Sequence, residues 1–298
     1  MQTINYCPQC GSSLIRALYD VIVTPTDIGW AKLLEEHNCS SFNYNIMHCS
    51  SCGLVFRDLR FSDSDLNILY GNNSSEKMRP LSHYWGRSQE VCDWISSKVD
   101  INISGIRILD IGGGQGEISD WFVEVLNCKC DVFDYGSSNN SYKPGLNIVG
   151  EIDPGVEYDL IMCNHVLEHV NHPAEFLKPF IAHSNPNTIF YFEVPFELIH
   201  YYCFKSKGHY EHINYFSISS VHNLGFALGL NPLSVELKLG YGSSIPVISA
   251  VFNLNKSLLL NRKNFTILKD VLSPKSAWLL MESKFRQRFN LTDLSHHS

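Results

Sequence analysis

The chain has 298 residues, 44% of them hydrophobic and 12% aromatic, and a formal net charge of −7. This content is enough to bury one full α/β core and to form a smaller second domain. The acidic balance and the absence of clustered basic residues argue against a nucleic-acid partner, which requires a basic face. Neither a secretory leader nor a run of eighteen apolar residues is present, so we expect a cytoplasmic protein with no membrane contact.

Two cysteine pairs of the form Cys-x-x-Cys-Gly lie in the first part of the chain. They supply four thiols, from Cys7, Cys10, Cys49 and Cys52. Four thiolates suit tetrahedral zinc, and a site closed by four sulfurs has a structural role. The 38 residues between the pairs exceed the usual finger spacing, so we expect them to form their own hairpin or helix. A redox dithiol is the alternative to a metal site.

The pattern of the chain changes after these cysteines and divides it into three parts. We expect a zinc-ribbon-like domain over 1–60, a helical linker or substrate lid over 61–104 and a main α/β domain over 105–298. Within the linker, a helix is predicted over 88–99, because its apolar residues share one helical stripe.

Short apolar runs alternate with helical patterns from Arg107 onward, which is typical of a mostly parallel sheet covered by helices. Strands are expected at 106–110, 130–134, 158–163 and 188–194, with helices at 117–126 and 174–183. A helix at 219–229 is followed by a closing pair of strands at 233–237 and 247–252, and then by a final helix at 273–290.

A glycine-rich loop, from Asp110 to Gly116, lies directly between the first of these strands and its helix. Backbone without Cβ atoms lets a ligand approach closely at such a turn. A dinucleotide fingerprint would need glycine at the sixth place from Gly112, where this chain has Glu117. Because glutamate would repel a pyrophosphate, a nicotinamide-dependent reductase is the weaker interpretation and a phosphate-free, cationic cofactor the stronger one. A tight turn without a ligand is the structural alternative.

This succession of strand, aspartate, glycine loop and helix resembles the class I S-adenosylmethionine-dependent methyltransferases, over residues 106–252. The resemblance implies a Rossmann-like fold, with a mostly parallel seven-stranded sheet flanked by helices. It also makes residues 105–298 the domain that binds S-adenosylmethionine. The segment 136–144 departs from the family, because it is too short and too rich in Ser and Asn for the usual second helix.

The resemblance further implies where the cofactor would lie. Its amino-acid part would contact Asp110 and the loop backbone, and its ribose hydroxyls would donate to Asp134, whose carboxylate offers two acceptors. Asn164 and His165 would lie beside the methionine moiety, and Glu151 and Ile152 would line the adenine. The cofactor-binding residues implied in this way are Asp110, Gly112, Gly114, Gln115, Asp134, Glu151, Ile152, Asn164 and His165.

The cysteine region is similar to the N-terminal zinc-binding part of bacterial methyltransferases that act on nucleotide-linked sugars and related small molecules. Residues 67–70 resemble the helix that leads toward the substrate pocket in those proteins. Titratable groups then cluster at 209–217, where Glu211 and His212 are catalytic candidates, with His169 as a second candidate base. Methyl transfer to a hydroxyl requires both an in-line geometry and a base.

The acceptor is expected to be a small molecule, with a hydroxyl of a nucleotide-linked sugar or a related precursor preferred. The Glu211-His212 pair and His169 also resemble sugar C-methyltransferases, which act through an enolate. His209 stands where those enzymes carry tyrosine, and their additional C-terminal domain has no counterpart here. A scaffold or sensor that binds S-adenosylmethionine without catalysis is the alternative of another class. The protein is expected to be a monomer or a homodimer.

Overall fold

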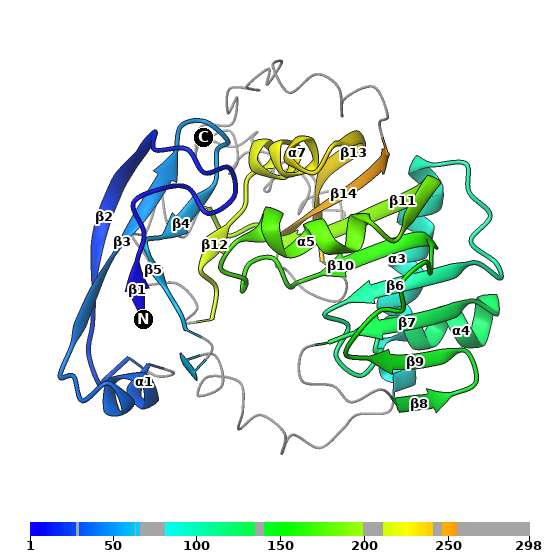
Figure 1. Cartoon of the computed structure of the whole chain (residues 1–298), viewed down its shortest axis with the longest axis horizontal. Helices are drawn as coiled ribbons and strands as arrows, with labels where there is room; N and C mark the ends of the chain where they lie inside the picture. The colour runs from blue at the N-terminus through cyan, green and yellow to red at the C-terminus, as the bar shows by residue number, and fades with distance from the viewer. Residues whose placement is uncertain are drawn as a thin grey trace, which may run out of the picture.

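The computed structural model describes residues 1–27, 30–62, 64–65, 81–134, 140–198, 211–240 and 246–254, which form three sheets and the helices around them (Figure 1). Three expectations lie outside the described residues: the helix at 67–70, the position of His209 and the final helix at 273–290. Among the described helices, none is long and apolar enough to span a membrane.

The largest sheet has eight strands in the order β13-β14-β11-β10-β6-β7-β9-β8. Its central pairs are parallel, as the alternating sequence pattern predicts. β13 and β14 form the expected closing pair at one edge and run antiparallel. The strands are β6 (Arg107–Ile111), β7 (Lys129–Phe133), β8 (Asn140–Lys143), β9 (Leu146–Val149), β10 (Tyr158–Asn164), β11 (Ser184–Pro195), β13 (Leu230–Leu239) and β14 (Pro246–Leu254).

A hairpin replaces the second helix of the alternating pattern. β8 and β9 are antiparallel to each other, and β9 then pairs in parallel with β7. The sheet therefore contains the seven strands that the Rossmann-like resemblance implies, with β8 added at the edge. The glycine at the turn, Gly145, has φ +86°, a backbone conformation that side-chain-bearing residues rarely adopt.

Helices cover both faces of this sheet (Figure 1). On one face, α3 (Trp85–Lys98) and α4 (Ser119–Leu126) bury apolar residues such as Ile95 and Phe122 against it. On the other, α5 (Pro173–Ile181) and α7 (Ile218–Ala227) do the same with Leu177 and Leu224. A single turn, η2 (Leu81–Tyr84), precedes α3.

The segment between the two cysteine pairs forms both a hairpin and a helix. β2 (Ile15–Val23) and β3 (Phe42–Cys49) are antiparallel, with α1 (Ala31–Glu36) in their connection. β4 (Val55–Arg57) extends this sheet, and β1 (Gln2–Thr3) pairs separately with β5 (Leu59–Arg60). Leu33 and Leu34 of α1 are buried against Trp30 and the hairpin, so this region has an apolar core of its own.

The N-terminal sheet is completed by a strand from the far half of the chain. β12 (Asn214–Tyr215) pairs antiparallel with β4, and the two regions lie side by side in Figure 1. The backbone N–H of Arg57 donates to the carbonyl of Ile213 (3.0 Å), and Cys7 and Cys52 share an apolar core with α5 and α7. The cysteine region is therefore packed directly onto the main sheet, and the division at 60 and 104 stays a prediction.

Candidate functional site

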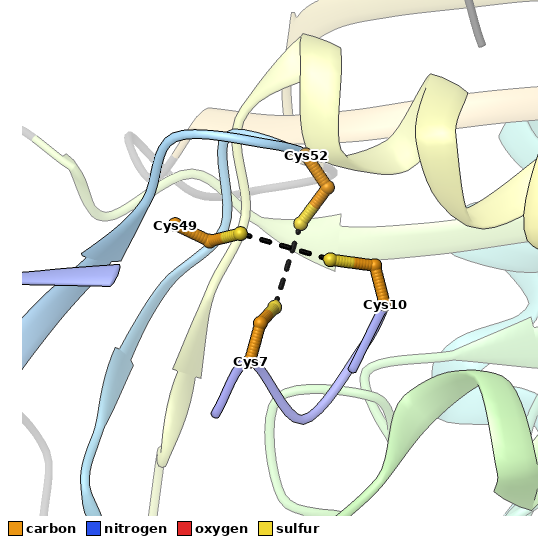
Figure 2. Close-up of side chains that lie close together, drawn as sticks. All are labelled: Cys7, Cys10, Cys49 and Cys52. Atoms are coloured by element: carbon orange, nitrogen blue, oxygen red, sulfur yellow. Dashed lines mark hydrogen bonds between the residues drawn. The ribbon is translucent and has the colours of Figure 1, made fainter. Parts of the chain in front are cut away.

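The four cysteines of the two pairs meet in one cluster (Figure 2). Cys7 Sγ lies 3.5 Å from Cys52 Sγ, and Cys10 Sγ lies 3.6 Å from Cys49 Sγ. A disulfide would bring two sulfurs to about 2.05 Å, whereas sulfurs that share a tetrahedral zinc are separated by about 3.8 Å. The spacing therefore fits a shared metal and not a pair of disulfides.

The two turns of this cysteine cluster have matching geometry. In each, the glycine after the second cysteine donates its N–H to the carbonyl of the first: Gly11 to Cys7 and Gly53 to Cys49, both at 2.9 Å. Both glycines have positive φ, +70° and +79°, which folds the chain back toward the sulfurs. These turns also contact α7, because Asn223 Nδ2 donates to the carbonyl of Cys52 (3.1 Å).

The glycine loop turns sharply at the end of β6, where the sequence places it. The N–H of Gly112 donates to the carbonyl of Phe133 at the end of β7 (2.7 Å). Gly112 has φ +69°, and a Cβ there would lie 2.4 Å from a methyl carbon of Val166. A side chain cannot be added without displacing Val166, so the bare backbone of this turn is required by its packing as well as by its conformation.

Asp110 lies at the end of β6 and is 1% exposed. Its Oδ2 accepts a hydrogen bond from Ser119 (2.8 Å), but its Oδ1 has no hydrogen-bond partner in the described residues. Burial raises the pKa of Asp110 to about 7, despite the Ser119 bond, and Glu117 adds to the rise. A buried carboxylate with one unsatisfied oxygen is suited to a cationic or hydrogen-bond-donating ligand.

Asp134 follows the end of β7, the neighbour of β6, and accepts a hydrogen bond from the N–H of Gly114 (2.9 Å). Two cavities of about 290 and 280 Å³ open here, and both are lined by Gly112. The first is also lined by Asp110 and Asn164, and the second by Asp134 and His165. The two acidic residues therefore lie on one continuous edge, as the sequence predicts.

Two histidines that the sequence singles out come together beside the second cavity. The rings of His169 and His212 are 4.8 Å apart, edge to face. His212 Nδ1 lies 2.7 Å from Glu197 Oε2, and His169 Nδ1 lies 3.2 Å from the backbone carbonyl of Glu211. The carboxylate that orients His212 is therefore Glu197, whereas Glu211 contacts His169 through its main chain.

Residues 84–235 match the family described as a methyltransferase domain, which is half of the chain. The chain belongs to this methyltransferase-domain family. Comparison with curated proteins gives no match.

Solved structures with a similar arrangement include other methyltransferases. The 1,6-didemethyltoxoflavin-N1-methyltransferase of Burkholderia thailandensis is 14% identical, with 68% of this chain and 95% of that chain covered and a TM-score of 0.49. An S-adenosylmethionine-dependent methyltransferase of Clostridium acetobutylicum is 10% identical, with 64% and 97% covered and a TM-score of 0.42.

In this methyltransferase, His165 lines the second cavity and has an unusual backbone conformation. Its φ is +53°, which is uncommon for a residue with a side chain, and such strain is concentrated at functional sites. His165 Nδ1 lies 3.4 Å from Glu168 Oε1, and its Nε2 lies 3.3 Å from Glu193 Oε1. Burial acts to lower the pKa of His165, but the two carboxylates raise it to about 9, so the ring is cationic at neutral pH.

Several residues of the methyltransferase site were not predicted from the sequence. Tyr84 and Arg87, at the start of α3, line the cavity of Asp110, and Arg87 also pairs with Glu193 (3.2 Å). Glu197 has no sequence signal beyond its position two residues after the end of β11. Arg87 could have been suspected, because a basic residue in a lead-in helix can reach the sheet edge.

Two expected cofactor residues lie apart from both cavities. Glu151 and Ile152 line a third hollow, together with Arg107 and Asp131. This hollow shares no lining residue with the cavities of Asp110 and Asp134. Their role at an adenine stays a prediction, as does that of Gln115.

Proposed function

We propose that the protein transfers the methyl group of S-adenosylmethionine to a small-molecule acceptor, and that the acceptor group is a hydroxyl of a nucleotide-linked sugar or a related precursor. The observation that supports this most directly is the edge formed by the glycine loop. There, Asp110 and Asp134 line two adjoining cavities, and His169 adjoins the second of them.

The residues present fit the cofactor chemically. Asp110 Oδ1 and the side-chain amide of Asn164 are buried without hydrogen-bond partners in the described residues, and both residues line the first cavity. They would bind the ammonium and carboxylate of the methionine part, while Asp134 would accept from the ribose hydroxyls. S-adenosylmethionine supplies an electrophilic methyl group on a sulfonium.

His212 is the proposed base for the acceptor hydroxyl. A carboxylate only accepts hydrogen bonds, so Nδ1 of His212 is the atom that donates to Glu197. In the neutral ring, Nε2 therefore carries the lone pair and can take a proton. His169, whose pKa is lowered by burial, is the proposed second member of this end of the site. Glu211 positions His169 through its carbonyl.

The four cysteines are proposed to hold a structural zinc. The sulfur spacing and the two matched turns support this role, and four thiolates leave no coordination position for water or substrate. The cluster contacts α7 and lies next to β12, and would therefore hold the segment that carries His212 against the main sheet.

Calorimetry with S-adenosylhomocysteine tests the cofactor part of this proposal. The wild-type chain is expected to bind it. Asp134→Asn is expected to weaken binding about tenfold or more, because the charge-assisted hydrogen bonds to the ribose hydroxyls are lost. A screen of nucleotide-linked sugars with S-adenosylmethionine should then yield S-adenosylhomocysteine. Failure to bind would contradict the proposal, and tight binding without turnover on any acceptor would favour the scaffold or sensor.

A further inference from the structure

Three side chains of the kinds that bind metals meet beside the cavity of Asp134. Glu168, His169 and His212 each offer one ligand atom, and these atoms all lie within 4.8 Å of one another. They come from two segments, the loop after β10 and the residues just before β12, so the fold itself brings them together. We call this set the histidine–glutamate cluster.

Glu168 is the most unusual member of the cluster, because it is 1% exposed and neither of its carboxylate oxygens has a hydrogen bond within the described residues. Removing a carboxylate from water is costly unless bonds or charges replace the lost hydration. Native proteins rarely leave such a group without hydrogen bonds unless a ligand or an ion completes it.

The cation nearest to Glu168 is shared with a second buried carboxylate. His165 lies 3.4 Å from Oε1, but it also faces the carboxylate of Glu193 at 3.3 Å, so one imidazolium is shared between two buried acids. His169 Nε2 lies 3.8 Å from the same Oε1. Glu193 has two further cations, Arg87 and Lys238, both at 3.2 Å, whereas neither reaches Glu168. An additional cation is therefore suited to Glu168 and not to Glu193.

The contacts of the Nδ1 atoms of His212 and His169 are those expected of histidines that bind a metal through Nε2. His212 Nδ1 contacts the carboxylate of Glu197 and His169 Nδ1 contacts the carbonyl of Glu211, and both partners can only accept. Each Nδ1 is then the protonated nitrogen of a neutral ring, which gives the lone pair to Nε2. Metal-bound histidines are typically oriented in this way by a carboxylate or carbonyl behind them.

We propose that Glu168, His169 and His212 form a second metal centre, which binds a divalent cation of the zinc type and keeps one coordination position open. Two imidazoles and one carboxylate with an open fourth position are the donor set of catalytic zinc sites. The ligand atoms are up to 4.8 Å apart, whereas a tetrahedral zinc with these donors needs about 3.4 Å, so binding requires the side chains to rotate inward.

This inference rests on the proposed function and makes the acceptor more specific. The open position would take the acceptor oxygen, and a bound cation lowers the pKa of a coordinated hydroxyl. With the cation bound to Nε2 of His212, the cation and not the free histidine activates the hydroxyl. The hydroxyl proton leaves to solvent, the oxygen bonds to the methyl carbon, and the carbon–sulfur bond breaks with its electron pair on sulfur. An acceptor that presents a hydroxyl, as a sugar does, is suited to such a centre.

Zinc titration of the full chain, with its cysteine cluster already filled, tests the second centre. Calorimetry with zinc chloride is expected to show one further equivalent in the wild type. Glu168→Gln and His212→Gln are expected to lose it or to weaken it at least about tenfold. His183→Gln is the matched control, because His183 lies at the opposite edge of the sheet, bonded to the carbonyl of Val156, and should titrate as the wild type.

The variants separate this inference from the proposed function. Glu168→Gln keeps the shape of the buried side chain. If this variant does not fold, His212→Gln tests the centre instead, because the side chain of His212 is 17% exposed and its replacement disturbs the core less. A wild type that takes no further zinc, or variants that titrate like it, would overturn the second centre while methyl transfer could still be observed. A further equivalent of zinc in a chain that does not bind S-adenosylhomocysteine would leave the centre standing and contradict the methyltransferase mechanism.

Discussion

The cysteine cluster and the edge that carries the glycine loop meet their bonding requirements in opposite ways. Around the cysteines, the turns are closed by backbone hydrogen bonds and contact α7, and only Cys10 of the four is exposed. Within the two described turns, one side-chain atom, Gln9 Oε1, is buried without a hydrogen-bond partner. At the edge, the fold leaves more buried polar atoms without hydrogen-bond partners among the described residues: Asp110 Oδ1, both ends of the Asn164 amide and both oxygens of Glu168.

This difference separates a structural site from a reactive one. A structural metal site satisfies its own backbone and leaves no position for another ligand. A binding site leaves donors and acceptors for the molecule that it receives, at a cost in stability that the rest of the fold must offset. The predictions below test whether the two regions differ in this way.

Replacing a cysteine of the cluster should have the largest effect on stability. Cys49→Ser removes one of four thiolates, and we expect loss of the proposed zinc and a fall of more than about 4 kcal/mol in the free energy of unfolding. Chemical denaturation and metal analysis measure both. Cys39→Ser, at an exposed cysteine outside the cluster, should change stability by less than about 0.5 kcal/mol. Equal stability of the two variants would remove the structural role of the cluster.

Replacing His212 should affect turnover instead of stability. His212→Ala removes the proposed base, and with the acceptor found by the nucleotide-sugar screen we expect kcat to fall on the order of 10²–10⁴-fold. Binding of S-adenosylhomocysteine should be unchanged, because His212 does not line either cavity. Steady-state kinetics and calorimetry on the same preparation check this, with His183→Gln as the control. Unchanged kcat would exclude His212 from the mechanism.

Replacing Asp110 should change how stability depends on pH. Because its pKa is raised to about 7 in the folded chain, from an ordinary value of 3.8, the folded state keeps a proton that the unfolded state releases. The contribution of Asp110 to the free energy of unfolding is largest below about pH 4, falls as the pH rises toward 7 and is constant above that. The slope of the fall is at most about 1.4 kcal/mol per pH unit.

Asp110→Asn should remove this component of the pH dependence. Denaturation without cofactor, compared at pH 5 and pH 8, is expected to show a smaller decline in the variant than in the wild type. The cysteine thiolates contribute equally to both chains, so the difference between them isolates Asp110. Parallel declines would show that the carboxyl is hydrated and already ionised at pH 5.

The parts of the fold that the sequence predicts correctly are those with a local pattern. The strand before the glycine loop and the helices at α3, α5 and α7 each contain enough residues for their periodicity to be read. The β8–β9 hairpin was not predicted, because each strand has only four residues. β12 has two residues and no pattern of its own, and its place is set by β4.

The site follows the same division. The meeting of the four cysteines was predictable, because the spacing within each pair is a local pattern. The proximity of Asp110 and Asp134 was predictable, because neighbouring parallel strands end at the same edge of the sheet. Glu197 and Arg87 were not, since their contacts with His212 and Glu193 depend on how loops and helices pack across the sheet. Contacts between segments that are far apart in the chain leave no local pattern in a single sequence.

The pairing of β12 with β4 also sets an order of assembly during synthesis. All four cysteines precede β12 in the chain, so the turns that bring them together can form before β12 is made. The sheet beside them lacks its last strand until Tyr215 has emerged from the ribosome. While the residues between β5 and β12 are being translated, β4 therefore has an unpaired edge, which is the kind of surface that pairs with other chains. A chain whose synthesis stops between β5 and β12 would expose this edge and be prone to aggregation, even with the turns of the cysteine cluster already closed.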